Sequence, residues 1–482
     1  MYKDTKLIFE YTTKTKPNRL IAPIDVEKAD LASFYGSAYK EELPDIPDLD
    51  EITVVRHYTN LSNKNYGVEN GTYPLGSCTM KYNPKINEDM ASLPGFAMTH
   101  PLQPEETAQG NLELLYLLER NFCDIFGMDK FTFQPSAGAH GEQTGLLLIK
   151  AYHEDRGDTK RRIMIVPDSA HGTNPASAAM AGYEVREVAS DERGLVNIDA
   201  LREVLADDVA GLMLTNPNTL GLFERDIEQI TQLVHDCGGL VYYDGANANA
   251  ILMQTRPGDM GFDVVHLNVH KTFSTPHGGG GPGAGPVGCK DILAPFLPKP
   301  IVIKKDGHYA LEYDMPKSVG KVRAFTGSFG ILVRTYAYVL ANGAEGLKEV
   351  SEGAVANSRY ILERVRDVYK LASEEPAMHE FVISGIGQKE NCGCSTLDIA
   401  KRLIDYGFHP PTVYFPLIVP EAMMVEPTET ESRMDLDAFA DALLQIAEEA
   451  KTNPELLHGA PHNAPISRPD EVRAAREPKL KA

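Results

Sequence analysis

Two ionisable residues follow stretches of sequence that have the character of buried strands. Asp244 ends the run GLVYYDG (239–245), and Lys271 follows DVVHLNVH (263–270). A carboxylate in such a low-dielectric place needs a partner, because an unpaired buried charge is costly. Burial also disfavours the ammonium form of a lysine, and a neutral amine is what forms a Schiff base with an aldehyde. The competing interpretation of Asp244 is a cap of the next helix.

A glycine-rich run (278–285) follows Lys271 and begins after His277. Glycine admits positive φ and lets the main chain approach a ligand closely. A nucleotide-binding Walker loop is not indicated, because its lysine follows the glycines and precedes a helix. The run is predicted to fold around a ligand, with a plain flexible loop as the alternative. His277 either shapes the entrance of the site or is an ordinary loop residue.

Small residues precede a helical pattern in QPSAGAHGEQ (134–143). The backbone N–H groups of Ser136, Ala137 and Gly138 can converge on an anion there, helped by the helix dipole. The segment predicts a phosphate site, although a simple tight turn has the same pattern.

Polar residues also follow two other β-rich runs. His171 either stacks on an aromatic ring or has a structural role, and Thr215 and Asn218 lie where an ordinary Asn-Pro turn is the alternative. A phosphate site, a stacking residue, an acid for a ring nitrogen and an amine for an aldehyde together describe one ligand. That ligand is pyridoxal phosphate.

The elements that must position these residues are short β-rich runs alternating with helical patterns. The runs are FTFQP (131–135), RIMIVPD (162–168), AGLMLTN (210–216), GLVYYDG (239–245) and DVVHLNVH (263–270). Apolar strands joined by helices predict an α/β fold, with a mostly parallel central sheet and helices on both faces. Ligands of such sheets bind beyond the carboxyl ends of the strands, where the residues above fall.

The chain is too long for one domain of ordinary size. A helix is predicted from about Leu332 to Leu371, followed by a strand in EFVIS and two further helices. We predict an N-terminal arm (1–105), a large cofactor-binding domain (106–331), a small C-terminal α/β domain (332–455) and a tail (456–482).

Composition excludes several classes of function. The net charge of −21 over 482 residues argues against a nucleic-acid partner. The N-terminus is too polar for a secretory signal and no run of about 18 apolar residues occurs, so a cytoplasmic protein without membrane association is expected. Cys392 and Cys394 lack two further ligands at suitable spacing, so no metal site is expected, and Cys78 is interpreted as structural.

The longest motifs resemble those of one family. The segments YPLGSCTMKYNP, QPSAGAHGE, SAHGTNPASA, YYDGANANA and LNVHKTFSTPHGGGGPG are similar to the glycine-decarboxylating P-protein of the glycine cleavage system, over nearly the whole chain. The resemblance implies a fold type I, aspartate-aminotransferase-like architecture. The single-chain form of that family has an additional first half. The resemblance therefore also implies a separate first subunit, a degenerate copy of the same fold, with two copies of each subunit.

The activity implied by the resemblance is glycine decarboxylation with pyridoxal phosphate, followed by transfer of the aminomethyl group to the lipoyl arm of the H-protein. Lys271 matches the Schiff-base lysine, Asp244 the partner of the ring nitrogen and His171 the stacking residue. The remaining cofactor contacts are assigned to Ala246 on the opposite face of the ring, to Ser136, Ala137, Gly138 and His270 at the phosphate, and to Thr215 or Asn218 at the ring hydroxyl.

The role of the arm is left open by the resemblance. Its residues Tyr73, Ser77 and Lys81 either close over the glycine carboxylate, with Lys81 as counter-ion, or pack on a neighbouring subunit. Two other functions compete with glycine decarboxylation and aminomethyl transfer. One is a fold type I amino-acid decarboxylase that releases a free amine, and the other is a non-catalytic scaffold, against which Lys271 and Asp244 both argue.

Overall fold

The computed structural model describes residues 6–11, 22, 25–40, 47, 49–277 and 283–480. It divides into two compact units, Gly71–Ala460 and a smaller one formed by Met1–Asn70 with Pro461–Ala482. The smaller unit contains η1 (Ile8–Glu10), α1 (Leu31–Tyr35), η2 (Gly36–Ala38), α2 (Glu51–Ser62) and α15 (Glu471–Arg476). The glycines at 278–281, predicted to fold around a ligand, lie outside the described residues. The boundaries of the four predicted parts of the chain stay predictions.

A seven-stranded sheet organises the larger unit, with the strand order β1-β7-β6-β5-β4-β2-β3. Its strands are β1 (Lys130–Thr132), β2 (Ile163–Pro167), β3 (Glu184–Val188), β4 (Val209–Leu214), β5 (Leu240–Gly245), β6 (Val264–Leu267) and β7 (Val287–Cys289). Strands β3, β2, β4, β5 and β6 pair in parallel, whereas β7 is antiparallel to both β6 and β1. The predicted mostly parallel sheet is confirmed: the FTFQP strand, β1, runs in the same direction as β6, although it joins the sheet through the antiparallel β7.

Two strands of the seven-stranded sheet were not predicted from the sequence. In β3 the residues EVREV are largely charged and exposed, because this strand forms an edge of the sheet and needs no apolar run. In β7 the residues VGC are too few to give a pattern. Neither strand carries a residue of the candidate site.

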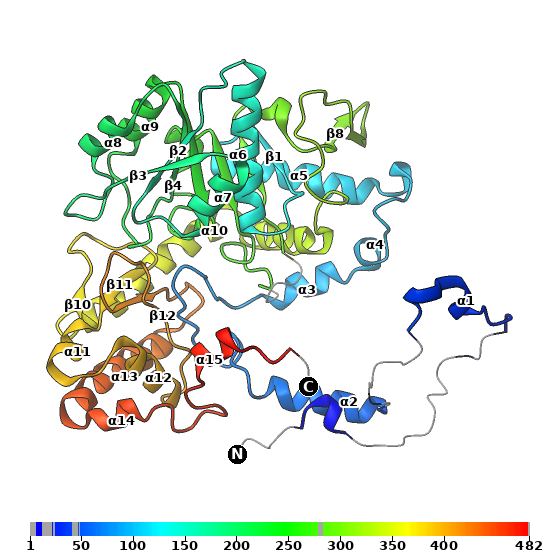
Figure 1. The fold of residues 1–482 in the computed structure, drawn as a ribbon. Helices are drawn as coiled ribbons and strands as arrows, with labels where there is room; N and C mark the ends of the chain where they lie inside the picture. The colour runs from blue at the N-terminus through cyan, green and yellow to red at the C-terminus, as the bar shows by residue number, and fades with distance from the viewer. Residues whose placement is uncertain are drawn as a thin grey trace. The chain divides into compact units, whose positions relative to one another are not determined.

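The core lies on both faces of this sheet. Ile163 and Ile165 of β2 pack in one hydrophobic cluster, and Met164 and Val166 pack in another, because successive side chains of a strand point to opposite faces. The first cluster includes residues of α5 (Gln109–Phe126), α8 (Ile198–Val204), α9 (Ile227–Asp236) and α10 (Phe329–Val365), and the second includes residues of α6 (Gly138–Asp155) and α7 (Thr173–Ala181). Figure 1 shows α6 and α7 in front of the sheet and α10 behind it.

The C-terminal part of the larger unit has a second sheet, in the order β10-β11-β13-β12. Its elements are β10 (Lys370–Leu371), β11 (Phe381–Ser384), α11 (Ile386–Cys392), α12 (Thr396–Asp405), β12 (Thr412–Val413), β13 (Ala422–Val425), α13 (Arg433–Thr452) and α14 (Pro454–His458). The strand expected in EFVIS is therefore confirmed. The helix expected up to Leu371 ends at Val365, and its backbone is interrupted at Gly343, where φ is 60°.

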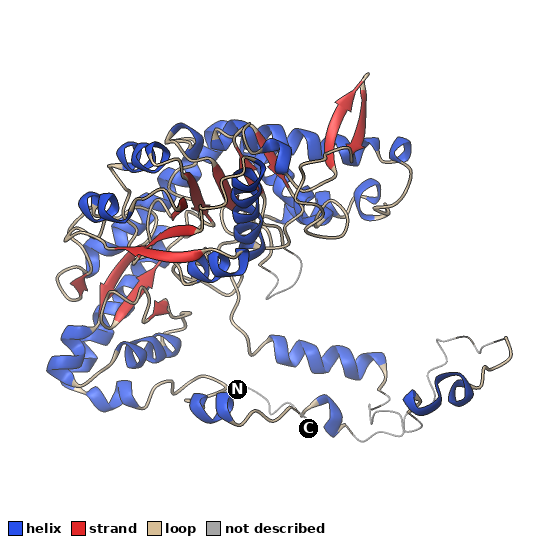
Figure 2. Ribbon diagram, turned by 45° about the horizontal axis from the view of Figure 1, so that its top comes forward, coloured by secondary structure: helices blue, strands red, loops and turns tan. Residues whose placement is uncertain are grey.

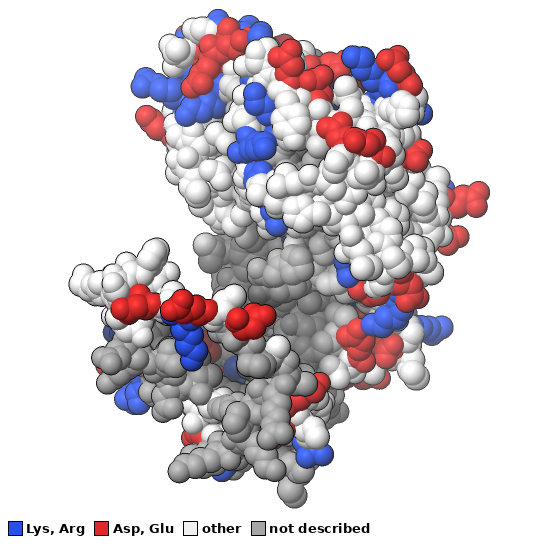
Figure 3. Space-filling view, turned by 90° about the vertical axis from the view of Figure 1, so that its right-hand side faces the viewer, with Lys and Arg blue, Asp and Glu red and all other residues white. Residues whose placement is uncertain are grey.

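Short elements complete the larger unit. They are α3 (Lys85–Ala91), α4 (Pro94–Ala97), η3 (Glu105–Thr107), η4 (Pro257–Asp259), η6 (Ala294–Phe296) and the hairpin of β8 (Ile301–Lys305) and β9 (His308–Glu312). Figure 2 shows this hairpin as a pair of red strands at the margin of the unit. Basic and acidic side chains are interspersed on the face drawn in Figure 3. Among the described helices, none is long and apolar enough to cross a membrane.

One glycine allows a close backbone contact between the loop after β4 and the segment before β11. Gly221 has φ +77°, and a Cβ atom there would lie 1.9 Å from the backbone oxygen of Glu380. Its own oxygen accepts a hydrogen bond from the N–H of Met378 at 2.7 Å. The segment before β11 therefore approaches the end of β4 at a distance that only glycine allows.

We expect Gly221→Ala to lower the free energy of unfolding by about 2 kcal/mol or more, because the substitution combines a strained φ with overpacking against backbone. Gly387→Ala is the matched control. Gly387 lies in α11 with open space around its Cβ position, so alanine is expected to stabilise the helix by about 0.5–1 kcal/mol. Denaturant unfolding of both variants measures the two effects, and equal midpoints would contradict the close approach.

Candidate active site

A cavity of about 160 Å³ lies beyond the carboxyl ends of the strands. Several strand ends contribute to its wall: Gly138 follows β1, His171 follows β2, Thr215 follows β4, Asp244 and Ala246 come from the end of β5, and Lys271 follows β6. The structure thus brings together residues that lie up to 133 positions apart in the chain. The parallel sheet does this because it aligns the same end of each strand at one edge.

Lys271 points to a segment that precedes the large sheet in sequence. Its Nζ donates a hydrogen bond to the backbone oxygen of Ser77 at 2.6 Å. Ser77 and Thr79 both have positive φ, at 67° and 46°. These values are uncommon for residues with a side chain, and they place the Ser77 carbonyl against the lysine. The segment around Ser77 therefore forms one wall of the cavity.

Asp244 is 3% exposed and is surrounded by groups that favour its charged form. Its Oδ2 accepts from Asn174 Nδ2 at 2.9 Å, its Oδ1 accepts from the N–H of Ala246 at 3.1 Å, and His266 Nε2 lies 3.5 Å from Oδ1. Burial raises the pKa of Asp244, but His266, these two hydrogen bonds and Lys271 outweigh burial and hold the pKa below its ordinary value. The Asp244 carboxylate is therefore ionised at neutral pH.

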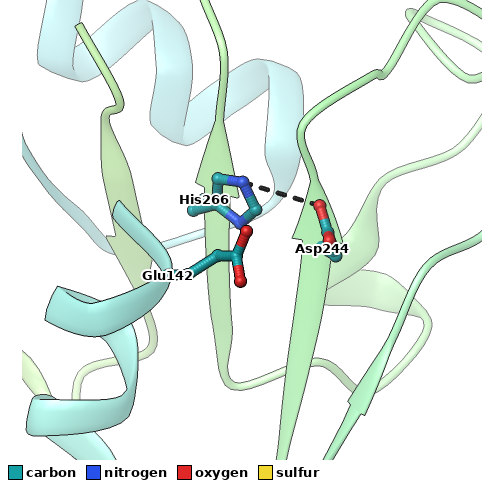
Figure 4. Close-up of side chains that lie close together, drawn as sticks. All are labelled: Glu142, Asp244 and His266. Carbon is teal, nitrogen blue, oxygen red and sulfur yellow. Dashed lines mark ion pairs between the residues drawn. The ribbon is translucent and has the colours of Figure 1, made fainter. Parts of the chain in front are cut away.

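Figure 4 shows Glu142 of α6 beside Asp244 and His266, which lie on the neighbouring strands β5 and β6. The amide of Asn174 links the two carboxylates, since its Nδ2 donates to Glu142 at 3.1 Å as well as to Asp244. The other ring nitrogen of His266 is hydrogen-bonded to the Tyr242 hydroxyl at 2.5 Å. This packing fixes the Asp244 carboxylate at the base of the cavity, where a ring nitrogen can face it.

Three lining residues have buried side-chain atoms without a hydrogen-bond partner among the described residues: His379 and two residues that follow strands of the large sheet. Thr215 Oγ1 and Asn268 Oδ1 have no hydrogen-bond partner among the described residues, and both residues line the cavity. A Cβ at Gly138 would lie 2.2 Å from Asn268 Oδ1, so the amide lies close to the first turn of α6. Buried polar groups are normally paired, which indicates a polar ligand at this place. A lysine, an ionised buried acid, a helix N-terminus and these two groups fit pyridoxal phosphate.

The predicted stacking residues also line the cavity. His171 precedes α7, and its Nδ1 is hydrogen-bonded to Thr173 Oγ1 at 2.9 Å. The His171 ring meets Phe415 edge-on, with 5.6 Å between the ring centroids. His171 and Ala246 as the two covers of a ring stay predictions.

Four other predicted residues are not among those that line the cavity: Ser136, Ala137, His270 and Asn218. Ser136 is hydrogen-bonded to the ring of His140, and both side-chain groups of Asn218 bond to backbone groups nearby. Burial, with Lys271 and His277 beside it, lowers the pKa of His270 to about 3, so this ring is neutral. Their assignment to the cofactor stays a prediction, and the bonding of Asn218 makes Thr215 the stronger candidate for the ring hydroxyl.

Sequence reasoning missed several lining residues. His379 and Glu380 come from the segment before β11, more than 100 positions after Lys271, and Asn268 and Glu142 were quoted in motifs without a role. The strand-end pattern would have found Asn268, which follows β6 directly. No sequence signal separates His379 and Glu380 from any polar pair ahead of a strand, because they reach the cavity only through the packing of the second sheet.

Lys81 was considered as a counter-ion of the glycine carboxylate, but its side chain is paired elsewhere. It is 2% exposed, its Nζ pairs with Glu429 Oε1 at 2.7 Å, and it donates to the backbone oxygen of Thr272 at 2.9 Å. Burial opposes the charge, but Glu429 and Tyr338 outweigh it and raise the pKa of Lys81 above its ordinary value. Lys81 is not among the cavity-lining residues, so its role as counter-ion of the glycine carboxylate is not supported.

We expect Lys81→Met to lower the free energy of unfolding by about 3–5 kcal/mol, because it leaves Glu429 with an uncompensated charge beside the core. The double variant Lys81→Met with Glu429→Gln removes both charges and should recover most of this loss. Chemical denaturation of the wild type, both single variants and the double variant gives the coupling energy. Additive losses would show that the pair does not act as a unit.

Solved structures with a similar fold define the fold class of this chain. The fold is that of the fold type I pyridoxal-phosphate enzymes. The crystal structure of the inhibitor-bound glycine decarboxylase (P-protein) of the glycine cleavage system aligns with a TM-score of 0.73 at 20% identity, over 86% of this chain and 94% of that chain. A NifS-like protein aligns with a TM-score of 0.61 at 15% identity, over 78% of this chain and 99% of the other.

The chain belongs to the glycine cleavage system P-protein family, whose family model matches residues 32–313. A second model, the glycine dehydrogenase C-terminal domain, matches residues 350–463. The probable glycine dehydrogenase (decarboxylating) subunit 2 of Caldanaerobacter subterraneus subsp. tengcongensis is 61% identical over 98% of both chains. The protein of the same name from Alkaliphilus oremlandii is 59% identical over 98% of this chain and 97% of its own length.

Proposed function

We propose that this chain decarboxylates glycine with pyridoxal phosphate and passes the aminomethyl group to the lipoyl disulfide of the H-protein. The decarboxylation follows from family membership and from relatives near 60% identity that are named for it. The observation that carries the chemistry is that Lys271 and Asp244 line one cavity at the ends of the neighbouring strands β6 and β5. A scaffold without activity has no use for this pair.

When bound, pyridoxal phosphate supplies an aldehyde that takes up amino groups and a protonated ring that withdraws electrons from the bond to the substrate carboxylate. Lys271 holds the aldehyde before glycine enters. The ionised Asp244 holds a proton on the ring nitrogen, which keeps the ring electron-poor. The first turn of α6 at Gly138 binds the phosphate through its N–H groups, and Thr215 accepts or donates at the ring hydroxyl. Ser136, Ala137 and His270 complete the proposed phosphate site.

Two partners belong to the proposal. The relatives carry the name subunit 2, which indicates assembly with another subunit. We place two copies of each subunit in the complex. The second partner is the H-protein, whose lipoyl disulfide accepts the aminomethyl group. A cavity of about 160 Å³ suits glycine and the end of a lipoyl arm better than a bulky amino acid.

Reconstitution tests the function. The chain is purified with and without its first subunit, loaded with pyridoxal phosphate, and assayed for exchange of labelled carbon dioxide into glycine with lipoylated and unlipoylated carrier. The expected result is exchange that requires both the first subunit and the lipoyl group. Release of free methylamine independent of the carrier would instead identify the chain as a simple amino-acid decarboxylase.

A further inference from the structure

Two buried carboxyl groups lie together at the edge of the cavity. Glu380 and Glu426 have carboxylate oxygens within 4.8 Å of each other, with a nitrogen of His379 in the same range, and all three residues are buried. Glu380 and His379 line the cavity that also has Lys271 in its wall, whereas Glu426 is not among the lining residues. Two like charges at this distance in a low-dielectric place disfavour ionisation of both, so one of the carboxyl groups retains a proton.

The hydrogen bonds decide which group is ionised. Glu426 accepts from the N–H and hydroxyl of Thr79 and from the side-chain amides of Asn247 and Asn249. Four donors directed at one carboxylate stabilise its charge. Glu380 accepts one such bond among the described residues, from the N–H of Ser77 at 2.8 Å. Glu380 is therefore the member of the pair that retains a proton.

Other titratable groups around Glu380 support this distribution. Burial and the charge of Glu426 outweigh the Ser77 N–H and the Lys271 amine, and raise the pKa of Glu380 to about 8. His379 lies 3.8 Å from Glu380, and burial lowers the pKa of its ring, so it is neutral and does not take the proton. Cys78 also faces the pair, and its pKa is raised mainly by burial, so its thiol is neutral.

The proposed reaction takes up one proton. The bond between the glycine α-carbon and its carboxylate breaks to release carbon dioxide, and the electron pair forms a carbon–sulfur bond while the sulfur–sulfur bond of the lipoyl group breaks. The departing sulfur leaves with an electron pair as a thiolate. The dihydrolipoyl product carries a thiol, so a proton must be delivered to that sulfur, and an acid matched to the ordinary thiol pKa of about 8.5 suits this transfer.

We propose that Glu380 is the catalytic acid that protonates the departing lipoyl sulfur, with Glu426 as the positioning residue that keeps the proton on Glu380. This inference rests on the proposed function. Glu380 lines the same cavity as Lys271 and directly precedes β11 of the second sheet, so the acid comes from a different sheet than the lysine. Water re-protonates Glu380 after each turnover.

The test uses the complex with the first subunit, loaded with pyridoxal phosphate, as wild type and as Glu380→Gln, Glu426→Gln and Glu431→Gln. Glu431 is the matched control, because burial raises its pKa too, but it is bonded to Thr72 and does not line the cavity. The first measurement is infrared titration of protonated carboxyl groups without glycine or carrier. A band that titrates near pH 8 should be lost in Glu380→Gln, remain in Glu431→Gln and titrate at lower pH in Glu426→Gln.

The second measurement is steady-state aminomethyl transfer to the lipoylated carrier. Glu380→Gln should lower kcat by about 10²-fold or more and change the KM for glycine by less than about threefold, whereas Glu431→Gln should match the wild type. Any of three results would overturn the inference. The first is an active wild type that lacks the band. The others are a Glu380→Gln variant with full kcat and a Glu380→Gln variant in which only the KM for glycine rises. A wild type that shows the band but does not convert glycine contradicts the proposed function, and with it the role of Glu380.

Discussion

Lys271→Ala is expected to abolish covalent attachment of pyridoxal phosphate and to lower kcat by at least about 10³-fold. The lysine amine is the only group at that strand end that we assign to the aldehyde, and loss of a residue that acts in covalent chemistry has effects of this size or larger. The fold should survive, since the Lys271 side chain makes one hydrogen bond among those described, to the Ser77 backbone oxygen, and its backbone bonds do not depend on the side chain. Borohydride reduction followed by mass analysis measures the attachment.

Lys271→Arg is the matched control for this prediction. A guanidinium retains the positive charge and can donate to the Ser77 oxygen, but it is always protonated and does not form the covalent bond. Both variants should therefore lose the reducible adduct and the visible absorbance of the bound cofactor. Covalent cofactor in either variant would show that another amine holds the aldehyde, and the assignment of Lys271 would be wrong.

Asp244→Asn has the second largest expected effect, a decrease in kcat of about 10²–10³-fold. Asparagine has the same shape, so it keeps the contact with Asn174 in part, but it has no charge to hold a proton on the ring nitrogen. The size of the effect is that of removing one fixed electrostatic partner in a buried active site. The absorbance maximum of the bound cofactor should shift as well, which reports the ring directly and independently of turnover.

The pH dependence of this effect has a definite sign. The pKa of Asp244 lies below its ordinary value, so the wild-type carboxylate remains charged from about pH 8 down past about pH 5. The ratio of wild-type to variant activity should therefore stay constant across the neutral range. A ratio that falls toward one near pH 6 would show that Asp244 is protonated there, contrary to its hydrogen bonds.

Asp263→Asn provides a matched control on the same sheet. Asp263 is also buried and also bonded to a histidine, His235, at 2.8 Å, but it precedes β6 at the opposite end of the strand from Lys271. Its replacement should lower stability, because Asp263 also accepts from the N–H of Val241 at 2.7 Å, and should leave the cofactor spectrum unchanged. An equal spectral change in both variants would mean that Asp244 acts through folding alone.

The strand-end pattern predicted a large part of the site. Asp244, Lys271, His171 and Gly138 line one cavity, because a residue directly after a buried parallel strand must emerge at the carboxyl edge of the sheet. The neighbour of the first strand was not predicted. β1 pairs with β7, which runs antiparallel to it, and the three residues of β1 show no pattern that identifies a partner more than 150 positions away.

The sequence by itself determined the parallel α/β core, the family and the pair formed by Lys271 and Asp244. These features depend on local periodicity and on motifs that are contiguous in the chain. Only the tertiary structure decided that Lys81 pairs with Glu429 outside the cavity lining and that Glu380 lines the same cavity as Lys271, close to a second carboxyl group. Charge state and contact depend on burial and on neighbours from distant segments, and those quantities exist only after the two sheets have packed.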